Sequence, residues 1–280
     1  LGLLIIMVGL AVHSCFLDGG SKGLEFYLKP DVQRAIDAGF MALVNDAMNQ
    51  AFFTLSVGMG SMCIFGSYLK KDRSLTQESV LIVTLDTFVA LTAGLIIFPA
   101  CFAFGVTPDA GPGLIFITLP NIFNNMAGGR FWGFLFFVFM SAAALTTVIA
   151  VLENIIAYFM DGYGWSRKKA VLVNFVTVTL LTLPCILGFN VWSGFEPFGK
   201  GSAVLDLEDF IISNNILPLG SFMFMLFCCH RYGWGWDNFV AEADTGRGMK
   251  FPKFLRFYLT WILPVVFLFI FAQGYIQKFF

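Results

Sequence analysis

Long apolar runs constrain the fold of this chain more than any other feature of its sequence. A helix needs about 20 mostly apolar residues to cross the hydrocarbon core of a bilayer, and seven windows of the sequence meet or approach that length. Only 12% of the 280 residues are charged, whereas a soluble domain usually carries about 25%. The runs predict an all-α, polytopic membrane protein with spans at about residues 1–17, 46–69, 79–104, 131–160, 168–190, 210–230 and 254–277.

The basic residues are unevenly distributed among the connections between these windows. Eleven of the 17 Lys and Arg residues lie in or next to three connections, and the alternate connections hold the other six. Cytoplasmic loops are enriched in Lys and Arg close to the span ends. We therefore expect a multi-pass protein of the cell inner (plasma) membrane whose loops 70–78, 161–168 and 231–254 lie in the cytoplasm.

The first residue of the chain, Leu1, already lies inside an apolar run. It is preceded by no Met and by no charged segment of the kind that opens a signal peptide. We interpret the sequence as a piece of a longer membrane protein, and residues 1–280 as one transmembrane domain fragment.

The connection over residues 105–130 is apolar, but it contains residues that interrupt helices. Pro112, Pro120 and several glycines are spread along it. Because the charge pattern places this connection outside, we expect an outer loop that is partly helical and packs into a vestibule. A plain loop is the alternative.

The second window carries a cluster of small and polar residues at its centre. Its sequence from Asn49 to Gly60 reads NQAFFTLSVGMG. Serine and glycine weaken a helix in lipid, and a break is tolerated where the freed backbone groups bind a ligand. The alternative is that these small residues form a helix face that packs closely against a neighbouring helix.

Two acidic residues lie well away from the ends of predicted spans, where a carboxylate costs about 2.5–3.5 kcal/mol on insertion scales. Asp86 has no basic residue nearby in the sequence, so we expect it to bind a cation. A packed, protonated carboxyl group is the alternative. For Glu153 we expect a hydrogen bond to a neighbouring broken helix rather than a role in proton transfer.

A third polar group lies in the fourth window. Ala143, Thr146 and Thr147 share one helix face, because positions i, i+3 and i+4 are neighbours on a helix. One backbone carbonyl and two hydroxyl groups offer oxygen ligands that suit Na⁺. The alternative is that both hydroxyls bond to the backbone of their own helix.

Several separated motifs occur in the order typical of one transporter family. QAFFTLSVGMG followed by GSYLKKD resembles the sixth helix and the next loop of the neurotransmitter:sodium symporters, in particular their bacterial leucine-transporter-like members. GLIFITLPNIF and AGGRFWGFLFF resemble the fourth extracellular loop and the eighth helix, and ALTT, SRKKA and LDLEDF fit the same order. The resemblance covers the chain from about the fifth to the eleventh helix. It implies the C-terminal part of an inverted-repeat transporter fold with broken helices.

The resemblance also implies roles for individual residues. A first Na⁺ site would use Thr54 and Asp86, and a second would use the carbonyl of Ala143 with Thr146 and Thr147. The residues that match the amino-acid pocket are Phe53, Ser56, Gly58, Met59 and Val151. Those that match the gates are Asp209 on the outer side, and Tyr68 and Asp161 on the cytoplasmic side. The basic partners of both gates would lie on a first helix and amino terminus that this chain lacks.

Two departures from the family pattern refine what we expect about chloride dependence and about the substrate. Chloride-dependent members hold an anion beside the first sodium, and Gln50 is a remnant of that anion site, whereas Asp86 supplies a fixed negative charge and Ala90 lacks a hydroxyl. Chloride should therefore not be required. Met59 and Val151 leave an adaptable pocket, which favours hydrophobic substrates larger than leucine, including aromatic amino acids.

The resemblance therefore implies a Na⁺-coupled amino-acid symporter that works by alternating access with two Na⁺ ions. Its partners would be a small-molecule amino acid and the lipid bilayer. The fold would also allow the protein to form a homodimer. The formal net charge of −1 leaves no broad basic field, so we expect no nucleic-acid partner. We expect no enzyme, because the sequence shows no nucleophile, base or metal constellation. The alternative is a non-transporting membrane scaffold or receptor on the same fold.

Overall fold

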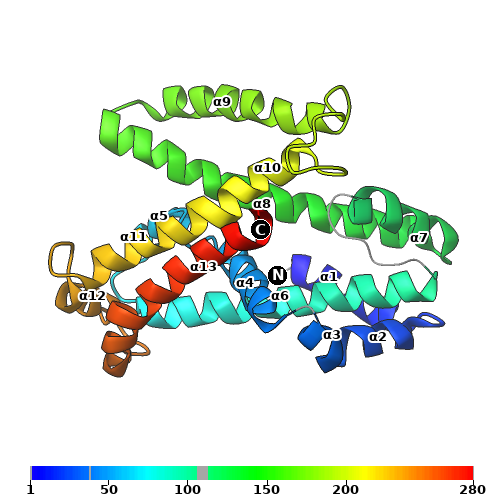
Figure 1. Ribbon diagram of the computed structural model, residues 1–280, viewed down its shortest axis with the longest axis horizontal. Helices are drawn as coiled ribbons and strands as arrows, with labels where there is room; N and C mark the ends of the chain where they lie inside the picture. Colours follow the sequence, from blue (N-terminus) through cyan, green and yellow to red (C-terminus); the bar gives the residue numbers. More distant parts are fainter. Residues whose placement is uncertain (1, 38, 106–112, 280) are drawn as a thin grey trace. The chain divides into compact units, whose positions relative to one another are not determined.

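The computed structural model describes residues 2–37, 39–105 and 113–279 of the chain (Figure 1). In these ranges every regular element is helical, apart from one isolated β-bridge between Arg73 and Arg247. The all-α fold class is thereby confirmed. The chain divides into two compact units: unit 1 comprises Leu1–Asp37 and Ile82–Ile149, and unit 2 comprises Ala38–Leu81 and Ala150–Phe280.

Unit 1 contains the first helices of the chain and the segment between the two long central helices. The unit boundaries fall inside α6 and α8, so each of these helices contributes residues to both units. The elements of unit 1 are α1 (Gly2–Cys15), α2 (Gly20–Leu28), α3 (Val32–Asp37), most of α6 (Leu75–Ala103), η1 (Leu114–Thr118), α7 (Leu119–Asn125) and the first part of α8 (Gly129–Tyr163).

Unit 2 contains the segment with the small-residue cluster and the C-terminal helices. Its elements are α4 (Phe40–Thr54), α5 (Ser61–Ser67), the end of α8, α9 (Arg167–Gly188), α10 (Val204–Ile211), η2 (Ile212–Ile216), α11 (Leu217–Cys229), α12 (Trp236–Ala243), η3 (Lys253–Leu255), η4 (Tyr258–Ile262) and α13 (Leu263–Phe279). Helices α11 and α13 of this unit lie side by side (Figure 1).

Five helical stretches of the described residues are long and apolar enough to cross a membrane. They are Leu75–Ala103, Gly129–Tyr163, Arg167–Gly188, Val204–Cys229 and Lys253–Ile276. The predicted span 1–17 corresponds to α1, which has 14 residues and bends by 113° into α2. The predicted span 46–69 corresponds to α4 and α5, and α4 begins earlier than expected, at Phe40.

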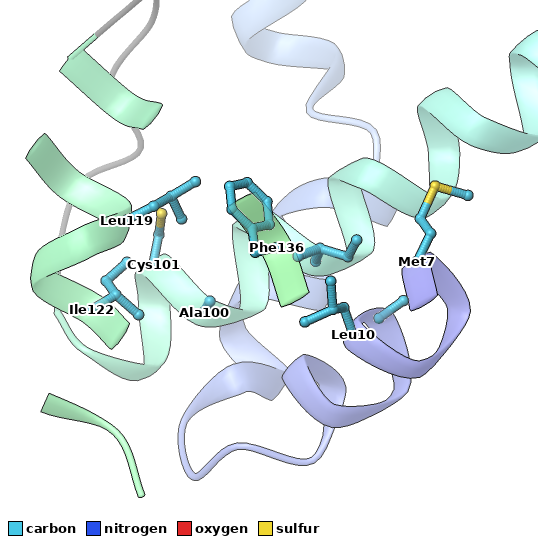
Figure 2. Packing of buried hydrophobic residues seen from close by; sticks show 9 residues of the cluster. Met7, Leu10, Ala100, Cys101, Leu119, Ile122 and Phe136 are labelled. Carbon is cyan, nitrogen blue, oxygen red and sulfur yellow. The ribbon is translucent and has the colours of Figure 1, made fainter. Parts of the chain in front are cut away.

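The core of unit 1 joins helices from three separate parts of the chain. Met7 and Leu10 of α1 meet Ala100 and Cys101 of α6, together with Phe136 of α8 (Figure 2). Leu119 and Ile122 of α7 are buried in the same cluster. The outer connection expected at 105–130 is thus partly helical, with η1 and α7, and its residues 106–112 lie outside the described part.

The core of unit 2 fixes α4 against the C-terminal helices. Phe52 of α4, Leu217 of α11, and Phe267 and Ile270 of α13 form one buried cluster. The Phe52 and Phe267 rings meet edge to face, with centroids 5.3 Å apart, a geometry that aromatic pairs prefer. Because Phe52 lies two residues before the end of α4, this cluster positions the start of the segment that follows.

Candidate functional site

The helix in the second window is broken, which is one of the two interpretations that the sequence left open. Helix α4 ends at Thr54 and α5 begins at Ser61. Between them the backbone has positive φ at Ser56 (51°), Gly58 (89°) and Gly60 (81°). A right-handed helix cannot continue through such residues, and glycine adopts this conformation without the penalty of a Cβ atom. Residues 55–60 therefore form a non-helical segment, which we call the unwound segment.

The unwound segment packs closely against α11 through two glycines. A Cβ atom on Gly58 would overlap the carbonyl oxygen of Leu217 and stand 2.7 Å from the backbone nitrogen of Ser221. A Cβ atom on Gly220 would in turn overlap the carbonyl oxygen of Gly58. The two interpretations left open by the sequence, a break and a close packing contact, thus apply to the same residues.

The unwound segment is also held by Asn154 of α8, which the sequence pattern did not single out. Its side-chain Nδ2 donates a hydrogen bond of 2.9 Å to the carbonyl oxygen of Met59. Val151, a predicted pocket residue, lies three positions earlier and hence on the same face of α8. The signal in the sequence that could have identified Asn154 is an amide beside an acid inside an apolar run.

Three predicted site residues line one hollow of about 440 Å³ in unit 2: Gln50 and Phe53 of α4, and Asp209 of α10. Asp209 accepts a hydrogen bond of 2.9 Å from the hydroxyl of Ser213. The other charged residues of the lining, not singled out from the sequence, are Asp46, Asp206 and Lys278. Three carboxylates and one ammonium leave the lining negative, because opposite charges cancel only in part.

A hydrogen-bonded network joins α5, α8 and α9 within unit 2. The hydroxyl of Tyr68, the residue after α5, donates to Oε1 of Glu153 over 3.0 Å. Arg167 donates to both carboxylate oxygens, over 2.9 Å from Nη1 and 2.7 Å from Nη2. The hydrogen bond expected between Glu153 and a broken helix is therefore present. A bidentate Arg partner is what a carboxylate in an apolar helix requires.

The basic member of this network, Arg167, belongs to the chain itself and pairs with Glu153. Glu153 is not one of the predicted gate residues, so the location of the gates' own basic partners stays a prediction. In the sequence Arg167 counted only as a loop charge, because it follows the fourth window. The predicted gate residue Asp161 is exposed and lies about two turns beyond Glu153 on α8.

The residues of the second predicted sodium site lie together in the part of α8 that belongs to unit 1. The hydroxyls of Thr146 and Thr147 both donate to the carbonyl oxygen of Ala143, over 2.8 Å and 3.1 Å. The local bonding that the sequence left open as an alternative is thus present. The donor set still fits Na⁺, because one carbonyl and two hydroxyl oxygens lie within hydrogen-bond distance and Na⁺ takes oxygen ligands.

The two residues of the first predicted sodium site belong to different units. Thr54 is the last residue of α4 in unit 2. Asp86 is half-buried in the part of α6 that belongs to unit 1. The hydroxyl and the carboxylate are both oxygen donors suited to Na⁺.

Comparisons with known proteins match nearly the whole chain. The family model described as "Sodium:neurotransmitter symporter family" matches residues 3–279. An uncharacterized sodium-dependent transporter of Haemophilus influenzae is 33% identical over 277 residues, which cover 97% of this chain and 58% of that relative. The uncharacterized sodium-dependent transporter YhdH of Bacillus subtilis is 31% identical over 273 residues, which cover 97% of this chain and 59% of that relative.

A solved structure also matches. The crystal structure of MhsT in complex with L-phenylalanine superposes with a TM-score of 0.84 and 38% sequence identity. The match covers 97% of this chain and 60% of that chain. This chain thus spans less than two thirds of the length of the relatives it matches.

Proposed function

Because this chain belongs to the sodium:neurotransmitter symporter family, we propose that the intact protein is a Na⁺-coupled amino-acid symporter that works by alternating access. The observation that carries the proposal is the unwound segment between α4 and α5. Two helix ends meet there inside a predicted span. Free N–H groups at a helix start suit the carboxylate of an amino acid, and free carbonyls at a helix end suit its amine.

The substrate is a hydrophobic amino acid, with aromatic side chains included. Phe53, Ser56, Gly58, Met59 and Val151 form its pocket in this proposal. The flexible thioether of Met59 and the small side chain of Val151 favour a pocket that adapts to large apolar groups. The likeness to MhsT, whose crystal structure is in complex with L-phenylalanine, supports this substrate class.

Two Na⁺ ions are co-transported. Thr54 and Asp86 contribute to one site, and Ala143, Thr146 and Thr147 to the other. Asp86 supplies the negative charge that chloride would otherwise provide, so transport does not require chloride. Binding of both ions favours the outward-facing state, and loss of the second ion to the cytoplasm permits inward opening.

The gates lie at the two ends of this pathway. Asp209 belongs to the outer gate and lines the hollow that also contains Phe53 and Gln50. Tyr68 and Asp161 belong to the cytoplasmic gate. The hydrogen bond between Tyr68 and Glu153 supports this role, because it ties the end of α5 to α8 on the side where the basic loops lie.

The protein occupies the inner (plasma) membrane, with loops 70–78, 161–168 and 231–254 in the cytoplasm. The excess of Lys and Arg in these connections supports this orientation. A family of transporters rather than enzymes is consistent with the expectation of no catalytic activity.

Uptake of radiolabelled L-phenylalanine by the intact protein in proteoliposomes tests the proposal. An inward Na⁺ gradient should drive accumulation, an equal K⁺ gradient should not, and replacing chloride by gluconate should leave the rate unchanged. L-tryptophan, L-tyrosine, L-leucine and L-methionine should compete better than small or polar amino acids. Absence of both Na⁺-dependent uptake and Na⁺-dependent binding would favour the scaffold alternative.

A further inference from the structure

The unwound segment leaves α5 as a short helix with little packing of its own. Helix α5 has seven residues, Ser61–Ser67, and Ser61 is its only buried residue. The side chains of Met62 and Phe65 are 42% and 40% exposed. Isolated helices shorter than about 12 residues are marginal, so contacts at the two ends of α5 must contribute to its placement.

Two adjacent residues of α8 provide those contacts. Glu153 accepts the hydroxyl of Tyr68 at the C-terminal end of α5, over 3.0 Å. Asn154 donates to the carbonyl of Met59 before the N-terminal end, over 2.9 Å. A Cβ atom on Gly60 would stand 3.4 Å from the same amide nitrogen, so the side chain of Asn154 lies directly against the backbone of the unwound segment.

The chemistry of this contact requires a carboxamide or another donor. The carbonyl of Met59 can only accept a hydrogen bond, which assigns the NH₂ group of Asn154 to the side that faces it. A carboxylate at position 154 could not donate, and a leucine would fill a similar volume without any polar group. The neighbouring Gly60 has φ 81°, a conformation in which the chain turns from the unwound segment into α5.

From this geometry we infer that Asn154 is a positioning residue, which holds the Met59 carbonyl and thereby sets the conformation of the unwound segment before substrate binds. The inference rests on the transport function proposed above, since Met59 and Gly58 are placed there in the amino-acid pocket. A segment that is already ordered loses less conformational freedom on binding, so its ligand binds more tightly. Asn154 therefore acts on substrate affinity through the backbone and not by touching the substrate.

Three substitutions at position 154 and one elsewhere separate this role from general stability. Asn154→Leu and Asn154→Asp remove the donor while keeping a similar side-chain volume, and Asn154→Gln keeps an amide. The matched control is Asn174→Leu on α9, where the Asn174 amide donates over 2.8 Å to the carbonyl of Ala170 in its own helix. All are made in the intact protein, and uptake of L-phenylalanine is normalised to the amount of transporter in the proteoliposomes.

Asn154→Leu and Asn154→Asp should raise the KM for L-phenylalanine about three- to tenfold, the effect of one lost hydrogen bond, while kcat changes less than about twofold. Asn154→Gln should recover most of the wild-type KM, and Asn174→Leu should leave it unchanged. An unaltered KM in Asn154→Leu, or equal losses in Asn154→Leu and Asn154→Gln, would overturn the assignment. So would a fall in kcat alone.

A second measurement keeps this inference separate from the transport proposal. If the wild-type protein shows no Na⁺-dependent uptake, the transport proposal fails, and hydrogen–deuterium exchange then decides whether Asn154 orders the segment. Amides in the peptide over residues 55–67 should exchange at least about threefold faster in Asn154→Leu than in wild type or Asn154→Gln. Equal exchange rates in all three proteins would overturn the positioning role.

Discussion

Arg167 holds both carboxylate oxygens of Glu153, with nitrogen–oxygen distances of 2.9 Å and 2.7 Å. The pair connects the first residue of α9 to the last third of the long apolar helix α8. The side chain of Glu153 is 17% exposed, and that of Arg167 is 58% exposed. Water therefore screens the charge of the arginine more than that of the carboxylate. Removing the arginine should consequently change the stability of the protein by a different amount than removing the carboxylate.

Arg167→Leu should destabilise the protein more than Glu153→Gln, because it leaves a mostly buried carboxylate without its cation. The double variant should recover part of the loss, with a coupling free energy of about 1 kcal/mol. Thermal unfolding of the purified protein in detergent measures all four forms. The control cycle uses Lys71→Leu and Glu242→Gln. The wild-type Lys71 and Glu242 side chains lie 3.7 Å apart and are 80% and 42% exposed. The stability changes of these two substitutions should therefore be additive. Additivity in both cycles would contradict the prediction.

Gly58→Ala should strongly destabilise the protein, by more than about 2 kcal/mol. The new methyl group would overlap the Leu217 carbonyl at a residue with φ 89°, and both effects are costly. Gly66→Ala is the matched control, since nothing lies within 4 Å of a Cβ atom at that position in α5. It should stabilise the helix by about 0.5–1 kcal/mol. Thermal unfolding and the yield of membrane-inserted protein report both effects, and similar behaviour of the two variants would refute the close packing.

Thr147→Ala should abolish Na⁺-dependent uptake while membrane insertion remains intact. The substitution removes one oxygen from the second proposed sodium site and also a local hydrogen bond of 3.1 Å to the carbonyl of Ala143. Thr179→Ala controls for the local bond, because the Thr179 hydroxyl donates over 2.8 Å to the carbonyl of Phe175 on α9. Uptake measured against Na⁺ concentration should be normal in this control. Normal Na⁺ dependence in Thr147→Ala would remove this threonine from the site.

Asp86→Asn should make uptake sensitive to chloride. The neutral amide no longer supplies the fixed charge that offsets Na⁺, so the variant should transport more slowly in gluconate than in chloride, whereas the wild type should transport equally in both. Asp237→Asn, which removes an exposed charge from α12, should behave like wild type. If the wild type itself needs chloride, the role proposed for Asp86 is wrong.

Much of the fold follows from residues that are close in the sequence. Apolar runs, whose transfer into lipid is favourable residue by residue, predicted the helices α6, α8 and α9 and the helical stretch Lys253–Ile276 with small errors at their ends. The start of α4 at Phe40 was missed because Asn45 and Asp46 interrupt the hydropathy directly after residues 40–44. These residues line the hollow of unit 2, and polar side chains that face a hollow do not end a helix.

The break between α4 and α5 was also within reach of the sequence, since Ser56, Gly58 and Gly60 provide the conformational freedom that a helix lacks. Only the tertiary structure decided which distant residues meet there. Asn154 and Met59 are 95 positions apart, and Glu153 and Tyr68 are 85 positions apart. The free energy of transfer into lipid and the preferred backbone conformation both depend mainly on residues that are close in the sequence. A hydrogen bond between distant side chains forms only when packing brings donor and acceptor within about 3 Å. A short stretch of sequence does not determine that distance.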